Sequence, residues 1–223
     1  MATPYSVTVL EDVASTQDEA RRRMSRDRAA VVVAHRQSRG RGRSGAPWET
    51  ADRAVAVSVA LPSRGDRDLF VPLVAGVAAR RVMGDAVRLK WPNDVLVGDD
   101  KVAGILVEVV GDTVVAGVGI NLYWPGAPEG AGALEVHDPG PERGPEIAES
   151  WARTLLELLE LEPWPRGEYV AGCSTLGRDI SWQPGGRGRA VDVAEDGSLV
   201  VVDELGSMVL LSSGAVRHVR PRA

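Results

Sequence analysis

The chain has 223 residues, of which 44% are hydrophobic and 26% charged, a composition typical of globular proteins and not of a disordered chain or a coiled coil. The formal net charge of −5 argues against a surface that binds nucleic acid throughout, although it is compatible with a local basic patch. The single cysteine, Cys173, excludes an internal disulfide, no apolar run reaches membrane-spanning length, and the N-terminus lacks a signal-peptide pattern. We therefore expect a reduced, soluble, cytoplasmic protein.

Alternating or β-branched apolar runs predict most elements of the first 123 residues as strands. In chain order these strands are Ser6–Leu10, Ala30–Ala34, Ala54–Leu61, Val87–Trp91, Val95–Val97, Lys101–Val110 and Thr113–Ile120. A helix is expected to begin near Thr16 and to end at about Arg26, because Thr16–Glu19 has the spacing of a capping box. A second helix is expected over Leu69–Met83, where apolar residues recur at helical spacing, with Gly84 as its C-cap.

The end of the chain predicts a small all-β unit. Residues 124–146 are rich in Pro, Gly and Glu and predict a loop, which an amphipathic helix over Ile147–Leu161 and a short helix over Arg166–Cys173 follow. After these helices, four or five short strands with turn signals between them have the spacing of a small β-barrel. We expect an α+β fold, with a mixed sheet backed by helices in residues 1–175 and the barrel in residues 176–223.

The use of lysine and asparagine is unusual. The chain has 24 arginines but only two lysines, Lys90 and Lys101, and only two asparagines, Asn93 and Asn121. A lysine in such a chain suggests a site that needs a compact ammonium group instead of a planar guanidinium. All four residues fall within one short stretch of the sequence, and coding bias together with chance is an equally good explanation of the pattern by itself.

The glycine-rich segment Arg39–Gly45 (RGRGRSG) is the first candidate for binding chemistry. Glycines let backbone N–H groups turn toward an anion, and arginines supply forked donors for a phosphate or a carboxylate. The segment is not a Walker P-loop, because the terminal Gly-Lys-Ser/Thr is absent. A solvated basic loop or an RNA-binding RG stretch explains this segment equally well when it is considered alone.

Two further segments could contact a nucleotide. In KWPND, the lysine Lys90 at a strand end can neutralise charge on a phosphoryl group, and Asn93 and Asp94 could hold substrate or Mg²⁺ through their oxygens. In Gly117–Asn121, glycines let a ligand lie against the strand, and Asn121 can bond a ribose or a base. The alternatives are a plain strand-to-turn junction for KWPND and a bulge with a turn asparagine for Gly117–Asn121.

The order of these segments resembles the biotin–protein ligase family over most of the chain. The matching residues in chain order are Ser15-Thr16, Gln37–Arg43, Trp48, KWPND at 90–94, KVAGILVE at 101–108 and Gly119-Ile120-Asn121. KWPND followed by K-x-A-G-I-L-x-E is highly specific for this family. The resemblance implies a catalytic domain of the class II aminoacyl-tRNA synthetase type, followed by an SH3-like barrel.

The resemblance also implies a two-step reaction. ATP and biotin, with Mg²⁺, would give biotinyl-5′-AMP and pyrophosphate, and the biotinyl group would pass to one lysine of a biotin carboxyl carrier domain of an acyl-CoA carboxylase. The biotin-binding residues would be Ser15, Thr16, Gln17, Gln37, Arg41, Gly42, Arg43, Lys90 and Gly104. The ATP-binding residues would be Arg43, Trp48, Asn93, Lys101 and Asn121. Lys90 and Arg43 would be catalytic, because positive charge must lie where one anion attacks another; the metal ligands are not indicated.

Two departures from the family pattern bear on these expectations. Gln17 stands where the family usually has Asn, and Ala46 stands where it often has a further arginine. We expect the missing arginine to weaken retention of the adenylate. The missing N-terminal helix–turn–helix implies a ligase that does not bind DNA, and relatives are often homodimers through the central sheet.

Two other functions remain as alternatives. A lipoate–protein ligase shares the fold and also adenylates an acid. An RNA-binding module could use the RGRGR segment, but the negative net charge and the 4% aromatic content count against it. Cys173 could be imagined as an acyl-thioester nucleophile, although a small buried thiol is the expected state.

Overall fold

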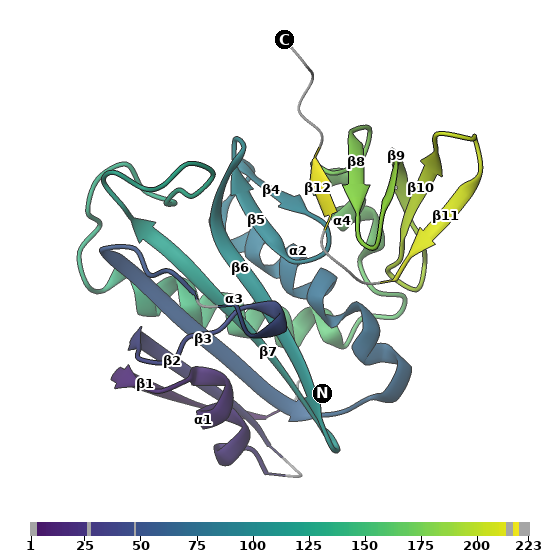
Figure 1. Ribbon diagram of the computed structural model, residues 1–223. Coiled ribbons are helices and arrows are strands. Elements are labelled where there is room, and N and C mark those ends of the chain that lie inside the picture. The colour runs from purple at the N-terminus through teal and green to yellow at the C-terminus, as the bar shows by residue number, and fades with distance from the viewer. Residues whose placement is uncertain (1–3, 26–27, 47, 213–215, 219–223) are drawn as a thin grey trace.

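A seven-stranded mixed sheet carries the larger part of the chain (Figure 1). The structure is a computed structural model that describes residues 4–25, 28–46, 48–212 and 216–218. The strands lie in the order β1-β2-β3-β7-β6-β5-β4, with β1 parallel to β2 and the other neighbours antiparallel. Their bounds are β1 Tyr5–Val13, β2 Ala29–Gln37, β3 Arg53–Pro62, β4 Val87–Lys90, β5 Asp94–Val97, β6 Asp100–Val110 and β7 Thr113–Tyr123. Every strand predicted for this part of the chain is confirmed, several with longer ends.

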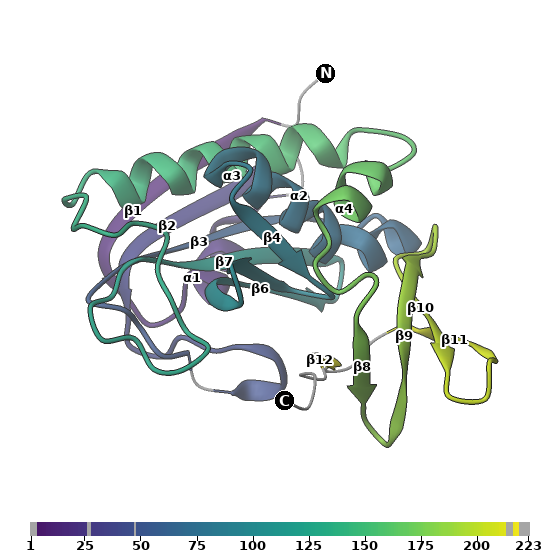
Figure 2. The same cartoon turned by 90° about the horizontal axis from the view of Figure 1, so that it is seen from above.

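The two faces of this sheet bury different side chains, as the period of two in a strand requires. Val31 and Val33 of β2 belong to the main core, whereas Val32 between them packs with Ala20 on the other face. Helix α1 covers that second face, and helices α2 and α3 cover the first (Figure 2). The helices are α1 Thr16–Arg23, α2 Val71–Met83, α3 Arg143–Leu159 and α4 Arg166–Gly172, with 3₁₀ segments η1 Arg43–Gly45 and η2 Gly65–Phe70.

Helix α1 begins at Thr16 as expected, but its capping and its C-terminal end differ from the expectation. Its N-cap is Ser15, whose Oγ accepts a hydrogen bond from the Asp18 backbone N–H at 3.4 Å. The capping box predicted for Thr16–Glu19 is therefore wrong, and Glu19 forms an ion pair with Arg23 one turn later (2.5 Å). The helix ends at Arg23 and is shorter than expected.

Helix α3 begins at Arg143, earlier than the expected start at Ile147. Its first turn includes Gly144, where an added Cβ would lie 3.2 Å from the Cβ of Val55 in β3. The absence of a side chain thus lets the helix start close against the sheet, which the sequence pattern did not reveal. The C-cap predicted at Gly84 of α2 is confirmed, with φ of 95° and an N–H that donates to the carbonyl of Arg80.

A second, five-stranded antiparallel sheet follows α4, with the order β11-β10-β9-β8-β12. Its strands are β8 Asp179–Trp182, β9 Gly186–Val193, β10 Leu199–Asp203, β11 Met208–Leu211 and β12 Val216–His218. Its inward side chains, Ile180 and Leu199 among them, belong to the same core as the large sheet. The buried Trp91 joins the two parts, because its indole N–H donates to the Gly197 carbonyl at 3.0 Å.

None of the helices in the described part of the chain is long and apolar enough to cross a membrane. Cys173 is buried at the C-terminal end of α4, and burial raises the pKa of its thiol. A neutral thiol is a poor nucleophile, so the expectation of a small buried thiol is confirmed.

Candidate active site

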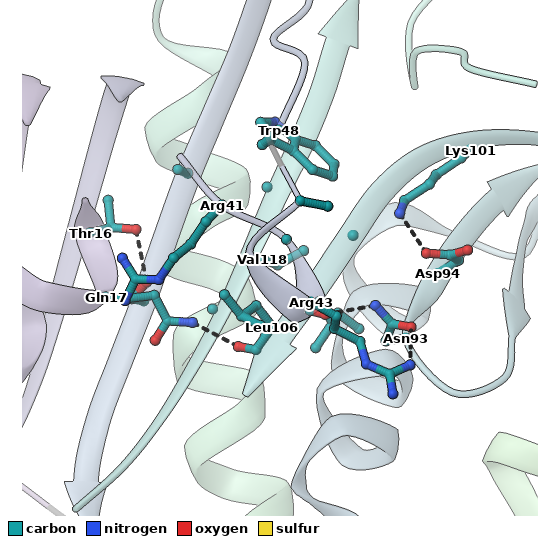
Figure 3. A pocket seen from close by; sticks show the side chains of 18 of the residues that line it. Thr16, Gln17, Arg41, Arg43, Trp48, Asn93, Asp94, Lys101, Leu106 and Val118 are labelled. Atoms are coloured by element: carbon teal, nitrogen blue, oxygen red, sulfur yellow. Dashed lines mark hydrogen bonds and ion pairs between the residues drawn. The ribbon is translucent and has the colours of Figure 1, made fainter. Parts of the chain in front are cut away.

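A cavity of about 400 Å³ opens over strands β3, β6 and β7, between the glycine-rich segment and the β4–β5 turn (Figure 3). We call it the central cavity. It brings together all but one of the sequence-predicted site residues. Those that line it are Ser15, Thr16, Gln17, Gln37, Arg41, Gly42, Arg43, Trp48, Lys90, Asn93, Lys101 and Gly104.

Glycines form the floor of the central cavity. An added Cβ would lie 2.7 Å from Trp48 Cζ3 at Gly104 and 3.0 Å from Trp48 Cε2 at Gly119. At Gly117 it would lie 2.7 Å from the Oγ of Ser58. Side chains at these positions would displace the groups that face the cavity, which explains the glycines in β6 and β7 in terms of close approach.

One end of the cavity, the hydroxyl–amide end, consists of Ser15, Thr16, Gln17, Gln37 and Ser58. The Oε1 atom of Gln37 accepts from the Thr16 N–H at 2.8 Å and from the Thr16 hydroxyl at 3.0 Å. Since the Thr16 hydroxyl has a single proton, the Ser58 hydroxyl must donate in the 2.8 Å contact between the two. These bonds fix the Gln37 amide with its Nε2 group as the remaining donor.

Gln17 presents the opposite polarity at the same end of the cavity. Its Nε2 donates to the Leu106 carbonyl at 2.8 Å, which orients the amide (Figure 3). Its Oε1 is buried and has no hydrogen-bond partner among the described residues. A buried carbonyl oxygen without a partner costs about 1–3 kcal/mol, so this atom is suited to accept an N–H from a ligand.

Arg41 forms the wall beside this end. Its guanidinium donates to Ser15 Oγ at 3.0 Å, to both carboxylate oxygens of Asp18 (3.0 and 3.3 Å) and to both of Glu108 (2.8 and 3.3 Å). Hydrogen bonds from Arg41 lower the pKa of Asp18, and those to Glu108 and then to Asp18 raise the pKa of Arg41 well above its usual value. The Ser15 oxygen, which already accepts from Arg41 and from the helix, retains its hydroxyl proton as a donor.

The other end, the lysine end, carries Lys90, Lys101, Arg43, Asn93 and Asp94. Asp94 pairs with Lys101 at 2.6 Å and with Lys90 at 3.7 Å, and Arg43 donates to Asn93 Oδ1 at 3.2 Å. Among the described lining residues at this end, three side chains are basic and only Asp94 is acidic. The cavity is thus suited to an anionic ligand at this end.

The turn that carries Asn93 is held from both sides. The Asn93 amide donates to the Ile105 carbonyl at 3.0 Å, and the Ile105 N–H donates to the Asn93 carbonyl at 2.8 Å. On the other side, Trp91 is buried and its backbone N–H donates to Thr175 Oγ1 at 3.0 Å. Lys90 and Asn93 therefore extend from a turn that is fixed by β6 and by the residues after α4.

Asn121 is the predicted site residue that does not line the central cavity. Its side chain is buried, and its Nδ2 donates to the carbonyl of Gly132 at 3.1 Å. The loop after β7 thus pairs only the Nδ2 group of this amide, since Asn121 Oδ1 is buried without a hydrogen-bond partner among the described residues. Gly132 also donates its N–H to the Lys101 carbonyl at 2.9 Å, which ties the loop to β6. The contact of Asn121 with a nucleotide stays a prediction.

The sequence analysis missed Ala56, Val57 and Ser58 of β3 and Val216 of β12, which all line the cavity. Ser58 is fully buried in β3 and completes the hydroxyl–amide end, and its signal was a single polar residue inside the apolar run AVAVSVAL. Val216 of β12 also lines the cavity. Nothing in the sequence near Val216 indicates that contact, because it depends on where the small sheet packs.

Comparisons with known proteins indicate which family this fold and cavity belong to. The model of the biotin/lipoate A/B protein ligase family matches residues 10–123, a little over half of the chain. The chain belongs to this family. The resemblance drawn from the motifs is thereby confirmed.

Individual relatives with high coverage are biotin ligases. A biotin–[acetyl-CoA-carboxylase] ligase of Paracoccus denitrificans is 38% identical, and the match covers 87% of this chain and 89% of that protein. The enzyme of the same name from Mycobacterium tuberculosis is 33% identical, with 85% and 79% covered. Among solved structures, the biotin protein ligase of Aquifex aeolicus in complex with biotin and ATP is 25% identical, covers 96% of this chain and 99% of its own, and has a TM-score of 0.77.

Proposed function

We propose that this chain is an ATP-dependent biotin–protein ligase. It converts biotin and ATP into biotinyl-5′-AMP and pyrophosphate, and it then transfers the biotinyl group to one lysine of a biotin carboxyl carrier domain of an acyl-CoA carboxylase. The names of the two relatives that cover most of the chain support this acceptor class, and the similar Aquifex aeolicus structure in complex with biotin and ATP supports the use of ATP. A homodimer, a cytoplasmic location and the absence of a DNA partner stay predictions.

The polarity of the hydroxyl–amide end carries the proposal. A ureido ring offers one carbonyl acceptor and two N–H donors, and this end offers donors on Ser15 and Gln37 and an orphan acceptor on Gln17. The dithiolane ring of lipoate offers no N–H or carbonyl group and would leave these groups unpaired. A site built to hydrogen-bond its substrate rejects an analogue without those groups by a factor on the order of 10⁴, which makes the lipoate–protein ligase the less favoured reading.

The lysine end suits the chemistry of adenylation. Attack of a carboxylate on an α-phosphate brings two anions together, so cations must be in place before the reaction. We assign this work to Lys90 and Arg43, with Asn93 and Lys101 beside the nucleotide and Trp48 against the adenine. The mixed anhydride is prone to hydrolysis, and closure of the glycine-rich segment over it would exclude water.

Mg²⁺ fits this site as a companion of the nucleotide. Among the described residues, no group of three or more acidic, histidine or cysteine side chains could hold a metal ion. Magnesium commonly keeps several waters and binds through substrate phosphates and one or two carboxylates, and Asp94 is the carboxylate that lines the cavity. When bound, the ion would neutralise pyrophosphate charge.

We also propose the two-domain organisation, with a catalytic domain in residues 1–175 and an SH3-like barrel in residues 176–223. The five antiparallel strands after α4 support this division. The contribution of Val216 to the cavity wall supports a role for the second domain in completing the site. An RNA-binding use of the RGRGR segment is not favoured, since Arg41 is paired with carboxylates.

The direct test is the intact mass of a purified biotin carrier domain after incubation with this protein, Mg²⁺-ATP and equal amounts of biotin and lipoate. We expect a single biotinyl addition that disappears when ATP is omitted. A lipoyl adduct would favour the lipoate ligase. No adduct and no biotin-dependent pyrophosphate release would refute the ligase, and salt-dependent RNA binding would then be measured.

A further inference from the structure

The guanidinium of Arg41 forms two bidentate ion pairs, one with Asp18 and one with Glu108. Its partners Asp18 and Glu108 come from two elements far apart in the sequence, helix α1 and strand β6. The three side chains are about one-third to one-half exposed, with relative accessibilities of 31% for Arg41, 45% for Asp18 and 33% for Glu108. Bidentate arginine–carboxylate pairs fix direction as well as charge, so two of them on one guanidinium define its position fully.

The same stretch of chain is also tied through its backbone. Ser38 donates its N–H to the Val13 carbonyl at 3.0 Å, and Arg39 donates to the Ala14 carbonyl at 2.9 Å. Residues 38–41 are thereby joined to the junction of β1 and α1. After Gly42 the contacts change: the Gly42 N–H donates to the Ala46 carbonyl at 2.7 Å, and Arg43 donates to Asn93 in the β4–β5 turn instead of to α1 or β6.

Ser15 connects this arrangement to the ligand pocket. Its Oγ accepts from Arg41 and from the Asp18 N–H, so both acceptor positions are used and the hydroxyl proton points elsewhere. Release of Arg41 would free one acceptor position and let the hydroxyl rotate. The direction of the donor that meets the ligand therefore depends on where Arg41 is held.

We propose that Asp18 and Glu108 are positioning residues that lock Arg41 in place before any ligand arrives, and so prepare the biotin head-group pocket. Neither carboxylate needs to touch substrate. The lock makes the first half of the glycine-rich segment part of the rigid site and leaves closure to the half after Gly42. Preorganisation of this kind strengthens binding, because the ligand does not have to order these side chains when it binds. The expected effect on KM for biotin rests on the proposed biotin ligation, whereas the locked position of Arg41 does not.

A proteolysis experiment tests the lock without any activity. Trypsin must take an arginine side chain into its specificity pocket, so cleavage after Arg41 requires that both carboxylates release it. We expect Glu108→Gln to accelerate this cleavage in the ligand-free protein by about tenfold, because a hydrogen bond to a charged group is worth roughly that factor. The control is Asp12→Asn, which removes the exposed ion pair of Asp12 with Arg36 on the same sheet and should leave cleavage after Arg41 unchanged.

A double-mutant cycle of Arg41 and Glu108 tests the effect of the lock on KM for biotin. Glu108→Gln should raise KM for biotin about tenfold while kcat and KM for ATP stay within twofold of the parent. If Glu108 acts through Arg41, adding Glu108→Gln to Arg41→Ala should change KM for biotin no further. Asp18→Asn, which removes the other carboxylate, should behave in the same way and serves if Glu108→Gln fails to fold in a thermal melt.

Three results would overturn the proposal. The first is cleavage after Arg41 at the parent rate in both carboxylate variants. The second is additive effects of Arg41→Ala and Glu108→Gln on KM for biotin. The third is an equal fall of kcat in both variants with KM for biotin unchanged. If the parent protein does not release pyrophosphate with biotin at all, the ligase function fails, and the cleavage rates still decide the lock.

Discussion

The indole of Trp48 lies directly on the backbone of Gly104, at a distance where a Cβ on Gly104 would stand 2.7 Å from the Trp48 ring. Lys101 lies over the same ring, with its Nζ 5.5 Å from the ring centroid. The glycine in KVAGILVE thus provides the surface against which the tryptophan rests, and together they form the wall assigned to adenine.

Gly104→Ala should therefore weaken use of ATP. The added methyl group forces the Trp48 ring to shift, and the loss of a well-placed stacking surface, worth about 1–3 kcal/mol, should raise KM for ATP roughly tenfold. The measurement is pyrophosphate release against ATP concentration. Gly167→Ala is the matched control, because nothing lies within 4 Å of a Cβ at that helical glycine. Unchanged KM for ATP in Gly104→Ala would contradict the assignment of Trp48.

Lys90→Ala should nearly abolish formation of the adenylate. Removing a positioned charge that stabilises the transition state lowers kcat by a factor on the order of 10²–10³. Single-turnover formation of biotinyl-5′-AMP measures this step. Arg88→Ala, an exposed position on the same strand, removes a positive charge outside the cavity and should have little effect. Adenylation at a near-normal rate in Lys90→Ala would show that Lys90 is not catalytic.

Ala46→Arg should slow the release of the adenylate. Ala46 lines the central cavity at the position where the family resemblance led us to expect a further arginine, so we expect a guanidinium there to reach the nucleotide phosphate. One charge-assisted hydrogen bond corresponds to a roughly tenfold slower dissociation. The rate is measured by chasing labelled biotinyl-5′-AMP from the protein, with Ala46→Gln as an uncharged control of similar length. Equal release from the two variants would remove the role suggested for this position.

His218 should make stability depend on pH. Its Nδ1 lies 3.3 Å from Arg178, which can only donate, so the neutral ring carries its proton on Nε2 and donates to Thr175 at 3.2 Å. Burial first, then Lys90 and Arg178, lowers the pKa of His218 from 6.5 to about 4, against the smaller opposite effects of Asp99 and Asp94.

The direction of this pH dependence follows from linkage. Between the ordinary pKa of 6.5 and about 4, the unfolded chain binds a proton that the folded chain does not, so stability is complete above pH 6.5 and falls as the pH decreases toward 4. The free energy of unfolding in urea at several pH values measures this slope. His218→Gln should flatten it, whereas His137→Gln, at an exposed position, should not. Equal slopes in all three proteins would show that His218 titrates normally.

The sequence determined the local structure and the chemistry of the motifs. Strand positions followed from alternation, since the period of two is a property of the backbone that neighbouring residues alone express. Helix caps and the start of α3 were less well predicted, because each depends on a single residue: Ser15, not Thr16, caps α1, and Gly144 lets α3 begin early. KWPND and KVAGILVE indicated the family because both motifs combine particular side-chain types at a fixed spacing, which can be read directly from the sequence.

Only the tertiary structure decided which side chains meet. Pairing of β3 with β7 brings segments far apart in the chain to one cavity, and no local pattern specifies that pairing. Arg41 finds Glu108 67 residues away, although the chain offers 31 acidic residues as partners, and Asn121 bonds a loop carbonyl outside the cavity. The sequence determines the charge and hydrogen-bonding capacity of each side chain. The directions and distances between these side chains are set only when the packed strands fix each backbone in place.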